Sequence, residues 1–234
     1  CIYTIELEKL LKSKGHEVAV FSMQHPFNKI SEYSVYFPSH IDFNKRSLKS
    51  LFSLMIRPFG SYEVRRKFTR LIHDFKPDII HLNNIHSQLS PVIAQIGKKH
   101  NIPVLWTLHD YKLVCPAYLL LNRGKPCEEC LDKRWSVVTK RCIKDNFIAS
   151  LIAYCEARYW NSGKLSKITD IFISPSNFLK VKMVKGGFNP SKIEILHNFV
   201  RLYGSPAQMN GQKDYYCYIG RISSEKGIET LLKA

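Results

Sequence analysis

The chain has 234 residues, of which 45% are hydrophobic and 23% charged, as in an ordinary globular protein. This length allows one large domain, or one domain and part of a second. The sequence contains no run of about 18 apolar residues, which excludes a membrane-spanning helix. It also shows no signal peptide.

The chain is strongly basic, with 35 lysines and arginines against 19 acidic residues and a formal net charge of +16. Such an excess suits anionic lipid, nucleic acid or a phosphorylated substrate, and the alternative is a basic surface without an anionic partner. The seven cysteines are odd in number and four of them cluster in one loop, so they favour a reducing compartment over a disulfide framework. We therefore expect a cytoplasmic protein.

Helical and strand patterns alternate along the first 199 residues. Apolar residues at helical spacing predict a helix that begins the chain and ends at Lys14-Gly15, and HEVAVFS at 16–22 predicts a strand. Further helices are predicted at 62–75, 88–100, 147–160 and 177–187, and further strands at 78–83, 102–110, 168–176 and 192–200. Because the strands are nearly all apolar, they indicate a parallel sheet flanked by helices, an α/β Rossmann-like domain.

The last residues predict the beginning of a second domain. Residues 200–214 are rich in Gly, Pro and polar side chains and are typical of a linker. Residues 215–219 then predict a short strand, and the final residues predict a helix. We therefore divide the chain into a first domain at 1–199, the linker, and the start of a second Rossmann-like domain at 215–234.

Two cations lie in the turn of that second domain. Gly220 permits a tight turn, and the start of the following helix directs backbone N–H groups toward the loop. Arg221 and Lys226 add positive charge at the same place. The pattern predicts an anion site, and the alternative is a surface turn with two solvated cations.

His109 and Asp110 stand at the carboxyl end of the strand predicted at 102–110. Open α/β sheets bind their ligands at this edge, which makes the pair a candidate for catalysis or ligand binding. The alternative is a structural histidine beside an aspartate that caps a turn.

Four cysteines follow in one long segment: Cys115, Cys127, Cys130 and Cys142. A C-x2-C pair with two flanking cysteines can supply four thiolates to a tetrahedral Zn²⁺. The spacing is not that of a common zinc ribbon, so reduced cysteines in a mobile loop are the alternative. We expect a segment of this length without secondary structure either to be stapled in this way or to act as a lid.

Residues 45–60, KRSLKSLFSLMIRPFG, mix apolar and basic side chains. This is the profile of a helix that lies on an anionic membrane surface. An amphipathic helix packed on its own domain has the same profile, and this alternative stays open.

Three stretches, TLHDYKLVCP, HNFV and YIGRISSEKGIETLLKA, together resemble a family-4 glycosyltransferase of the GT-B fold. The resemblance covers nearly the whole chain, and GR-x4-KG is its most specific motif. It implies retaining transfer of a sugar from a nucleotide diphosphate sugar to a saccharide or lipid-linked acceptor hydroxyl, with no cofactor required for catalysis. It also implies a role in cell-surface polysaccharide or glycolipid synthesis, at the inner face of the membrane.

The same resemblance assigns roles to individual residues. Arg221 and Lys226 would hold the donor diphosphate, Gly220 would let the backbone approach the phosphates, and His109 would reach toward the donor sugar. The family's first strand and glycine-rich loop would precede residue 1, and its paired glutamates would follow residue 234. We therefore take the chain as a piece cut at both ends and expect no turnover by it alone.

Two other functions fit parts of the sequence. A basic nucleic-acid-binding module with a cysteine-metal loop accounts for the charge and the C-x2-C pair, but it gives no purpose to His109 and Asp110. We therefore expect no nucleic-acid partner. A non-catalytic scaffold that keeps the GT-B fold is the second alternative.

Overall fold

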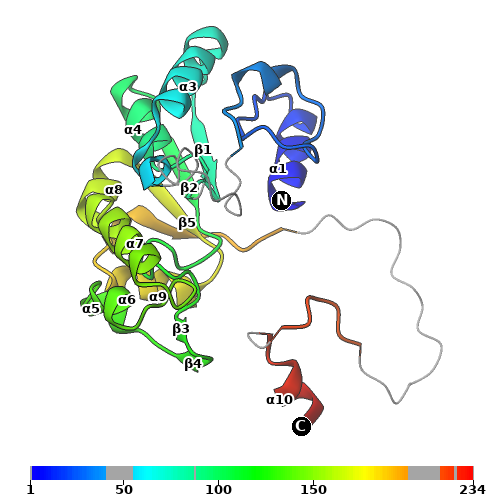
Figure 1. Cartoon of the computed structure of the whole chain (residues 1–234). Coiled ribbons are helices and arrows are strands. Elements are labelled where there is room, and N and C mark those ends of the chain that lie inside the picture. The colour runs from blue at the N-terminus through cyan, green and yellow to red at the C-terminus, as the bar shows by residue number, and fades with distance from the viewer. Residues whose placement is uncertain (1, 41–54, 87, 200–216, 224–225, 234) are drawn as a thin grey trace, which may run out of the picture.

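The computed structural model describes residues 2–40, 55–86, 88–199, 217–223 and 226–233. Its centre is a four-stranded sheet in the order β1-β2-β5-β6, in which every neighbouring pair is parallel (Figure 1). The strands are β1 Ile80–Asn83, β2 Val104–Thr107, β5 Ile171–Ser174 and β6 Ile193–Ile195. The prediction of a Rossmann-like α/β domain with these four strands is therefore confirmed.

The predicted helices are also present, with ends set by local chemistry. Ser61 accepts a hydrogen bond from the Val64 N–H and caps one helix, and Ser176 accepts from the Leu179 N–H and caps another. The main helices are α1 Ile2–Ser13, α3 Tyr62–Phe75, α4 Val92–Lys99, α7 Phe147–Tyr159, α8 Ser162–Ile168, α9 Asn177–Lys185 and α10 Ile228–Lys233. Short helical turns are η1 Glu32–Tyr36, η2 Arg57–Phe59, α5 Glu129–Asp132, α6 Ser136–Thr139 and η3 Pro190–Lys192.

The core lies between the sheet and these helices. α4 packs against β1 and β2 and also contacts α3 and α8, whereas α9 packs against β5 and β6. Trp106 of β2 stacks on Phe172 of β5 with ring centroids 6.1 Å apart, and Phe188 meets Phe172 edge-on at 5.2 Å. All three rings are buried. The apolar strand residues of the sequence therefore form the buried centre of the sheet, as predicted.

The strand predicted at 16–22 is absent, and that prediction is wrong. A strand exists only where a neighbour supplies ladder hydrogen bonds, and these residues pair with no strand in the part of the chain that the structure describes. Their apolar side chains are used differently. Phe21 packs against Phe37 and Phe68, with centroid distances of 6.4 and 4.9 Å, and thereby attaches the segment to the core.

The segment between β2 and α7, expected to lack secondary structure, contains several small elements. A hairpin is formed by β3 Leu121–Asn122 and β4 Lys125–Pro126, with Arg123 and Gly124 at its turn. Both turn residues have positive φ, 49° and 77°, which is the conformation a two-residue hairpin loop requires. The short helices α5 and α6 follow. The segment therefore has secondary structure of its own.

The predicted linker at 200–214 lies outside the described residues, as do residues 215 and 216 of the predicted last strand. Residues 217–223 form no strand, whereas the predicted final helix is present as α10. A strand of a second sheet needs partners from that sheet, and none lies in the described ranges. The second domain therefore stays a prediction.

Candidate functional site

The carboxyl end of the sheet brings together side chains that are far apart in the sequence. The last residues of β1 and β2, Asn83 and Thr107, are register partners, and His109 follows β2 by two residues. The His109 Nε2–H donates to Asn83 Oδ1 across 2.8 Å. Tyr3 of α1 meets the His109 ring edge-on at 4.9 Å and lies 5.4 Å from the ring of Phe199.

Burial lowers the pKa of His109 below its ordinary value, so its imidazole is neutral near pH 7. With Nε2 protonated and bound to Asn83, Nδ1 is left as a hydrogen-bond acceptor. Behind it, His81 Nε2 hydrogen-bonds to Thr107 Oγ1 at 2.7 Å, and burial, followed by repulsion from the protonated form of His109, lowers the pKa of His81. The edge therefore presents a neutral acceptor suited to a hydroxyl group.

Asp110 points into a different environment from its neighbour His109. It accepts the Lys112 N–H at 2.8 Å, and burial raises its pKa above the ordinary value. Its Oδ1 lies 3.8 Å from Nε2 of His86, a buried ring stacked on Trp106. The structure therefore uses Asp110 to shape the loop after β2, as the capping alternative predicted.

A buried ion pair supports this loop. Lys112 Nζ lies 2.8 Å from Glu156 Oε2 of α7, and both side chains are about nine-tenths buried. Burial pulls the pKa of Lys112 down, but Glu156 and Tyr118 more than offset it, so the pKa lies above the ordinary value. Lys112 Nζ also reaches the Pro116 carbonyl at 3.3 Å and lies 4.6 Å from the centre of the Tyr118 ring. Neither Lys112 nor Glu156 was predicted from the sequence as part of an ion pair.

We expect His86 to make the stability of the domain pH-dependent. Burial, followed by the charge of Lys112 and by repulsion from the protonated form of His109, lowers its pKa from 6.5 to about 3. Between those values the unfolded chain binds a proton that the folded chain does not, so stability is full above pH 6.5 and falls as the pH drops. At pH 5 the loss from this group is about 2 kcal/mol, since each pH unit is worth about 1.4 kcal/mol.

Urea unfolding of wild type and His86→Gln at pH 7 and pH 5 measures this effect. The variant is expected to lose less stability than wild type between the two pH values. Equal losses in both proteins would assign the pH dependence to other groups, such as His81.

The predicted donor-binding residues lie in the last described segment. Gly220 is in a bend that is closed by the Tyr218 hydroxyl, which donates to the Arg221 carbonyl at 2.9 Å. A Cβ at Gly220 would stand 2.7 Å from Tyr218 Oη, so a larger residue there would displace this exposed tyrosine side chain. Lys226 lies just before α10, where its N–H bonds to the Ser223 carbonyl at 3.0 Å.

The structure does not bring these cations to His109. In Figure 1 the segment that ends in α10 follows the grey trace and lies apart from the sheet. The common site of Arg221, Lys226 and His109 therefore stays a prediction. Asn83, Tyr3 and Phe199 were not predicted for this edge. The final asparagine of the strand IHLN, at the same edge as His109, is the signal that could have identified Asn83.

The four loop cysteines do gather in one region. Cys115 and Cys130 interact closely, and their interaction lowers the pKa of the Cys115 thiol and raises that of the Cys130 thiol. Cys142 Sγ accepts from Asn122 Nδ2 at 3.4 Å, and Lys140 Nζ lies 3.7 Å from the Cys127 sulfur. Within the described ranges, however, no three His, Cys, Asp or Glu side chains are arranged to hold one metal ion.

The zinc site therefore stays a prediction with a direct test. Mass spectrometry of the purified chain for metals is expected to give one zinc per chain, and Cys130→Ser should remove it because three thiolates bind more weakly than four. Cys155→Ser, at an exposed cysteine outside the loop, is the matched control. A folded wild-type chain without metal would leave the four thiols as reduced cysteines.

The proposed membrane segment at 45–60 is described only from residue 55. Arg57 within it is buried and does not face solvent. Its guanidinium donates to Ser61 Oγ at 2.9 Å and to the Ser39 carbonyl, and it lies 3.5 Å from Glu63 Oε2. Arg57 is therefore packed within the domain, as the alternative for this segment has it, and membrane contact by the rest of the segment stays a prediction. Residues 45–54 lie outside the described part.

Among the described residues, no helix is both long enough and apolar enough to cross a bilayer.

A parallel α/β sheet with polar side chains at its carboxyl edge is the arrangement of a Rossmann-like ligand-binding domain. A family model described as Glycosyltransferase Family 4 matches residues 2–202, and the chain belongs to this family. The α/β fold agrees with that membership, and the role of His109 stays a prediction.

A curated relative in Klebsiella pneumoniae is the "Uncharacterized 42.6 kDa protein in cps region". It is 25% identical over 240 residues, which cover 97% of this chain and 58% of the relative. The chain thus spans somewhat more than half the length of that protein. No solved structure matches the chain.

Proposed function

We propose that this chain provides the acceptor-side domain of a retaining glycosyltransferase. The enzyme moves a sugar from a nucleotide diphosphate sugar to a hydroxyl of a saccharide or lipid-linked acceptor. The observation that carries this proposal is the family match over residues 2–202 of a chain whose sheet presents His109 at its carboxyl edge. The relative from a cps region supports a role in cell-surface polysaccharide synthesis.

The residues of this chain have separate roles in that reaction. Neutral His109, fixed by Asn83, accepts a hydrogen bond from a donor-sugar hydroxyl through Nδ1. Arg221 and Lys226 bind the diphosphate and stabilise the charge that grows on it as the glycosidic bond breaks. In the complete enzyme both sets of groups contact the same donor molecule.

The test uses the enzyme encoded by the complete open reading frame. It is incubated with a panel of nucleotide diphosphate sugars and simple saccharide acceptors, and release of the nucleoside diphosphate is followed. Nuclear magnetic resonance of the product then compares the anomeric configuration of donor and product. Retention is expected. Inversion would exclude the retaining mechanism, and the absence of transfer with every donor would favour the non-catalytic scaffold.

We also place the enzyme in the cytoplasm, at the inner face of the membrane, where a lipid-linked acceptor would be presented. The net charge of +16 supports binding to anionic lipid, which adds about 1 kcal/mol for each basic residue near the surface. Arg57 is excluded from this role by its burial. Equal sedimentation with neutral and anionic vesicles would remove the electrostatic basis of this placement.

A further inference from the structure

A second polar site lies away from the sheet, in the segment between β2 and α7. It is a hollow of about 330 Å³ between the β3–β4 hairpin and the residues that follow α6. This volume lies at the lower end of the range for small-molecule sites, so a phosphorylated group with a small organic body fits in it. The residues that line it are Leu121, Asn122, Arg123, Lys140, Arg141, Cys142, Lys144 and Asp145.

The lining is strongly positive. Four of its eight residues are cations and one is a carboxylate. Lys140 pairs with Glu129, and Arg123 lies 4.0 Å from Asp145 in a solvent-exposed contact that stabilises little. For Arg141 and Lys144 the described part of the chain provides no ion pair. The hollow therefore keeps at least two positive charges for a ligand.

The backbone of the hollow is held in an unusual conformation. Arg123, Arg141, Lys144 and Asp145 all have left-handed φ angles, between 46° and 52°. Each such residue other than glycine costs on the order of 1–2 kcal/mol, and such costs concentrate at functional sites. Three of the four are cations of the lining, so the strained positions and the charged positions coincide.

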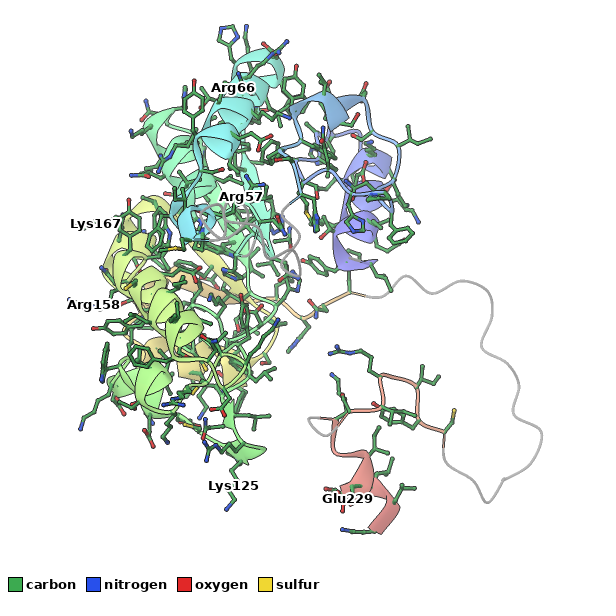
Figure 2. The ribbon with its side chains drawn as sticks, in the orientation of Figure 1. Arg57, Arg66, Lys125, Arg158, Lys167 and Glu229 are labelled. Carbon is green, nitrogen blue, oxygen red and sulfur yellow. The ribbon has the colours of Figure 1, made fainter. Side chains whose placement is uncertain are left out.

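The chemistry of these groups fits phosphoryl oxygens. An arginine presents a planar fork that binds two oxygens at once, and a lysine adds a compact charge beside it. Lys125 of β4 lies at the lower end of the domain in Figure 2 and adds a further cation beside the hairpin turn. The one carboxylate of the lining, Asp145, makes a weak, exposed contact with Arg123.

We propose that this hollow is an anion site that takes a phosphoryl group, with Arg141 and Lys144 as its main cations. It is separate from the proposed donor site, because the segment 121–145 supplies all of its residues and Arg221 and Lys226 play no part in it. A soluble phosphorylated compound and an anionic lipid headgroup present the same oxygens. The experiment therefore has one arm for each source.

In the first arm, inorganic pyrophosphate is titrated into the full chain by isothermal calorimetry. The double variant R141Q/K144Q is expected to raise Kd at least tenfold. The control R66Q/K167Q removes two exposed cations from α3 and α8, far from the hairpin in Figure 2, and has the same net charge. Asp145→Asn should lower Kd, since it removes the one carboxylate, and it tests the site independently of the double variant.

In the second arm, the same proteins are floated with phosphatidylglycerol vesicles and with phosphatidylcholine vesicles. If R141Q/K144Q loses pyrophosphate binding but still binds phosphatidylglycerol vesicles, the ligand is a soluble phosphorylated compound. If it loses binding to these vesicles but still binds pyrophosphate, the ligand is a lipid headgroup. If R66Q/K167Q weakens both kinds of binding as much as R141Q/K144Q does, or if neither variant changes them, the hollow is not an anion site.

Discussion

Replacing Lys112 with methionine is expected to lower the free energy of unfolding by about 3–5 kcal/mol, because it leaves the buried carboxylate of Glu156 without its partner. The two charged groups lie 2.8 Å apart and are almost completely removed from solvent. Lys112 also bridges to the Pro116 carbonyl, so the variant loses a hydrogen bond inside the loop. Urea unfolding monitored by circular dichroism measures the change.

An exposed pair of the same geometry provides the control. Lys12 and Glu8 on α1 are also 2.8 Å apart but lie at the surface, with the Lys12 side chain half exposed, and Lys12→Met is expected to cost less than about 1 kcal/mol. The double variant Lys112→Met, Glu156→Leu should recover much of the loss, since it leaves no unpaired buried charge. Equal costs for Lys112→Met and Lys12→Met would show that the buried pair does not stabilise the fold.

In the enzyme encoded by the complete open reading frame, Arg221→Ala is expected to lower kcat by about 100- to 1000-fold. Its guanidinium, in the proposed mechanism, meets a diphosphate whose negative charge increases in the transition state. Stabilisation that is stronger in the transition state than in the bound substrate appears in kcat. Steady-state kinetics with saturating donor and acceptor measures the loss.

Two further variants test whether the loss of kcat is specific to Arg221. Lys233→Ala removes a cation of α10 that is paired with Glu229, and it is expected to leave kcat within about twofold of wild type because this exposed pair contributes little. His109→Ala should raise KM for the donor, as it removes a contact made with the bound sugar. An unchanged kcat in Arg221→Ala would end the assignment of that residue to the leaving group.

Much of the fold could be predicted because its signals are local. Strands β1, β2, β5 and β6 are short apolar runs with clear ends, and Pro77 and Ser176 mark helix boundaries through fixed backbone preferences. The strand at 16–22 was predicted wrongly because residues 16–22 have the apolar pattern of a strand, but this pattern does not show whether another strand pairs with them. A sequence window records which residues are apolar, and it does not record which neighbour covers them.

The candidate site was predictable only in part for the same reason. His109 could be found from its place at the end of a strand. Its contacts with Asn83 and Tyr3 arise from the register of the sheet and the packing of α1, which no single motif encodes. The Lys112–Glu156 pair joins residues from two separate elements, and each of them reads as an ordinary surface charge when seen alone.

The order of the strands also has a consequence for how the domain folds during its synthesis. Because β1, β2, β5 and β6 stand side by side in the order of the sequence, each can join the growing edge as the ribosome releases it. The addition of β5 to β2 is delayed, because residues 108–170 must first leave the ribosome. The two ends of this long segment must then come together before β5 can pair with β2. We expect this closure to be the slow step of domain formation, and the segment with the thiols and the basic hollow to be structured before it is complete.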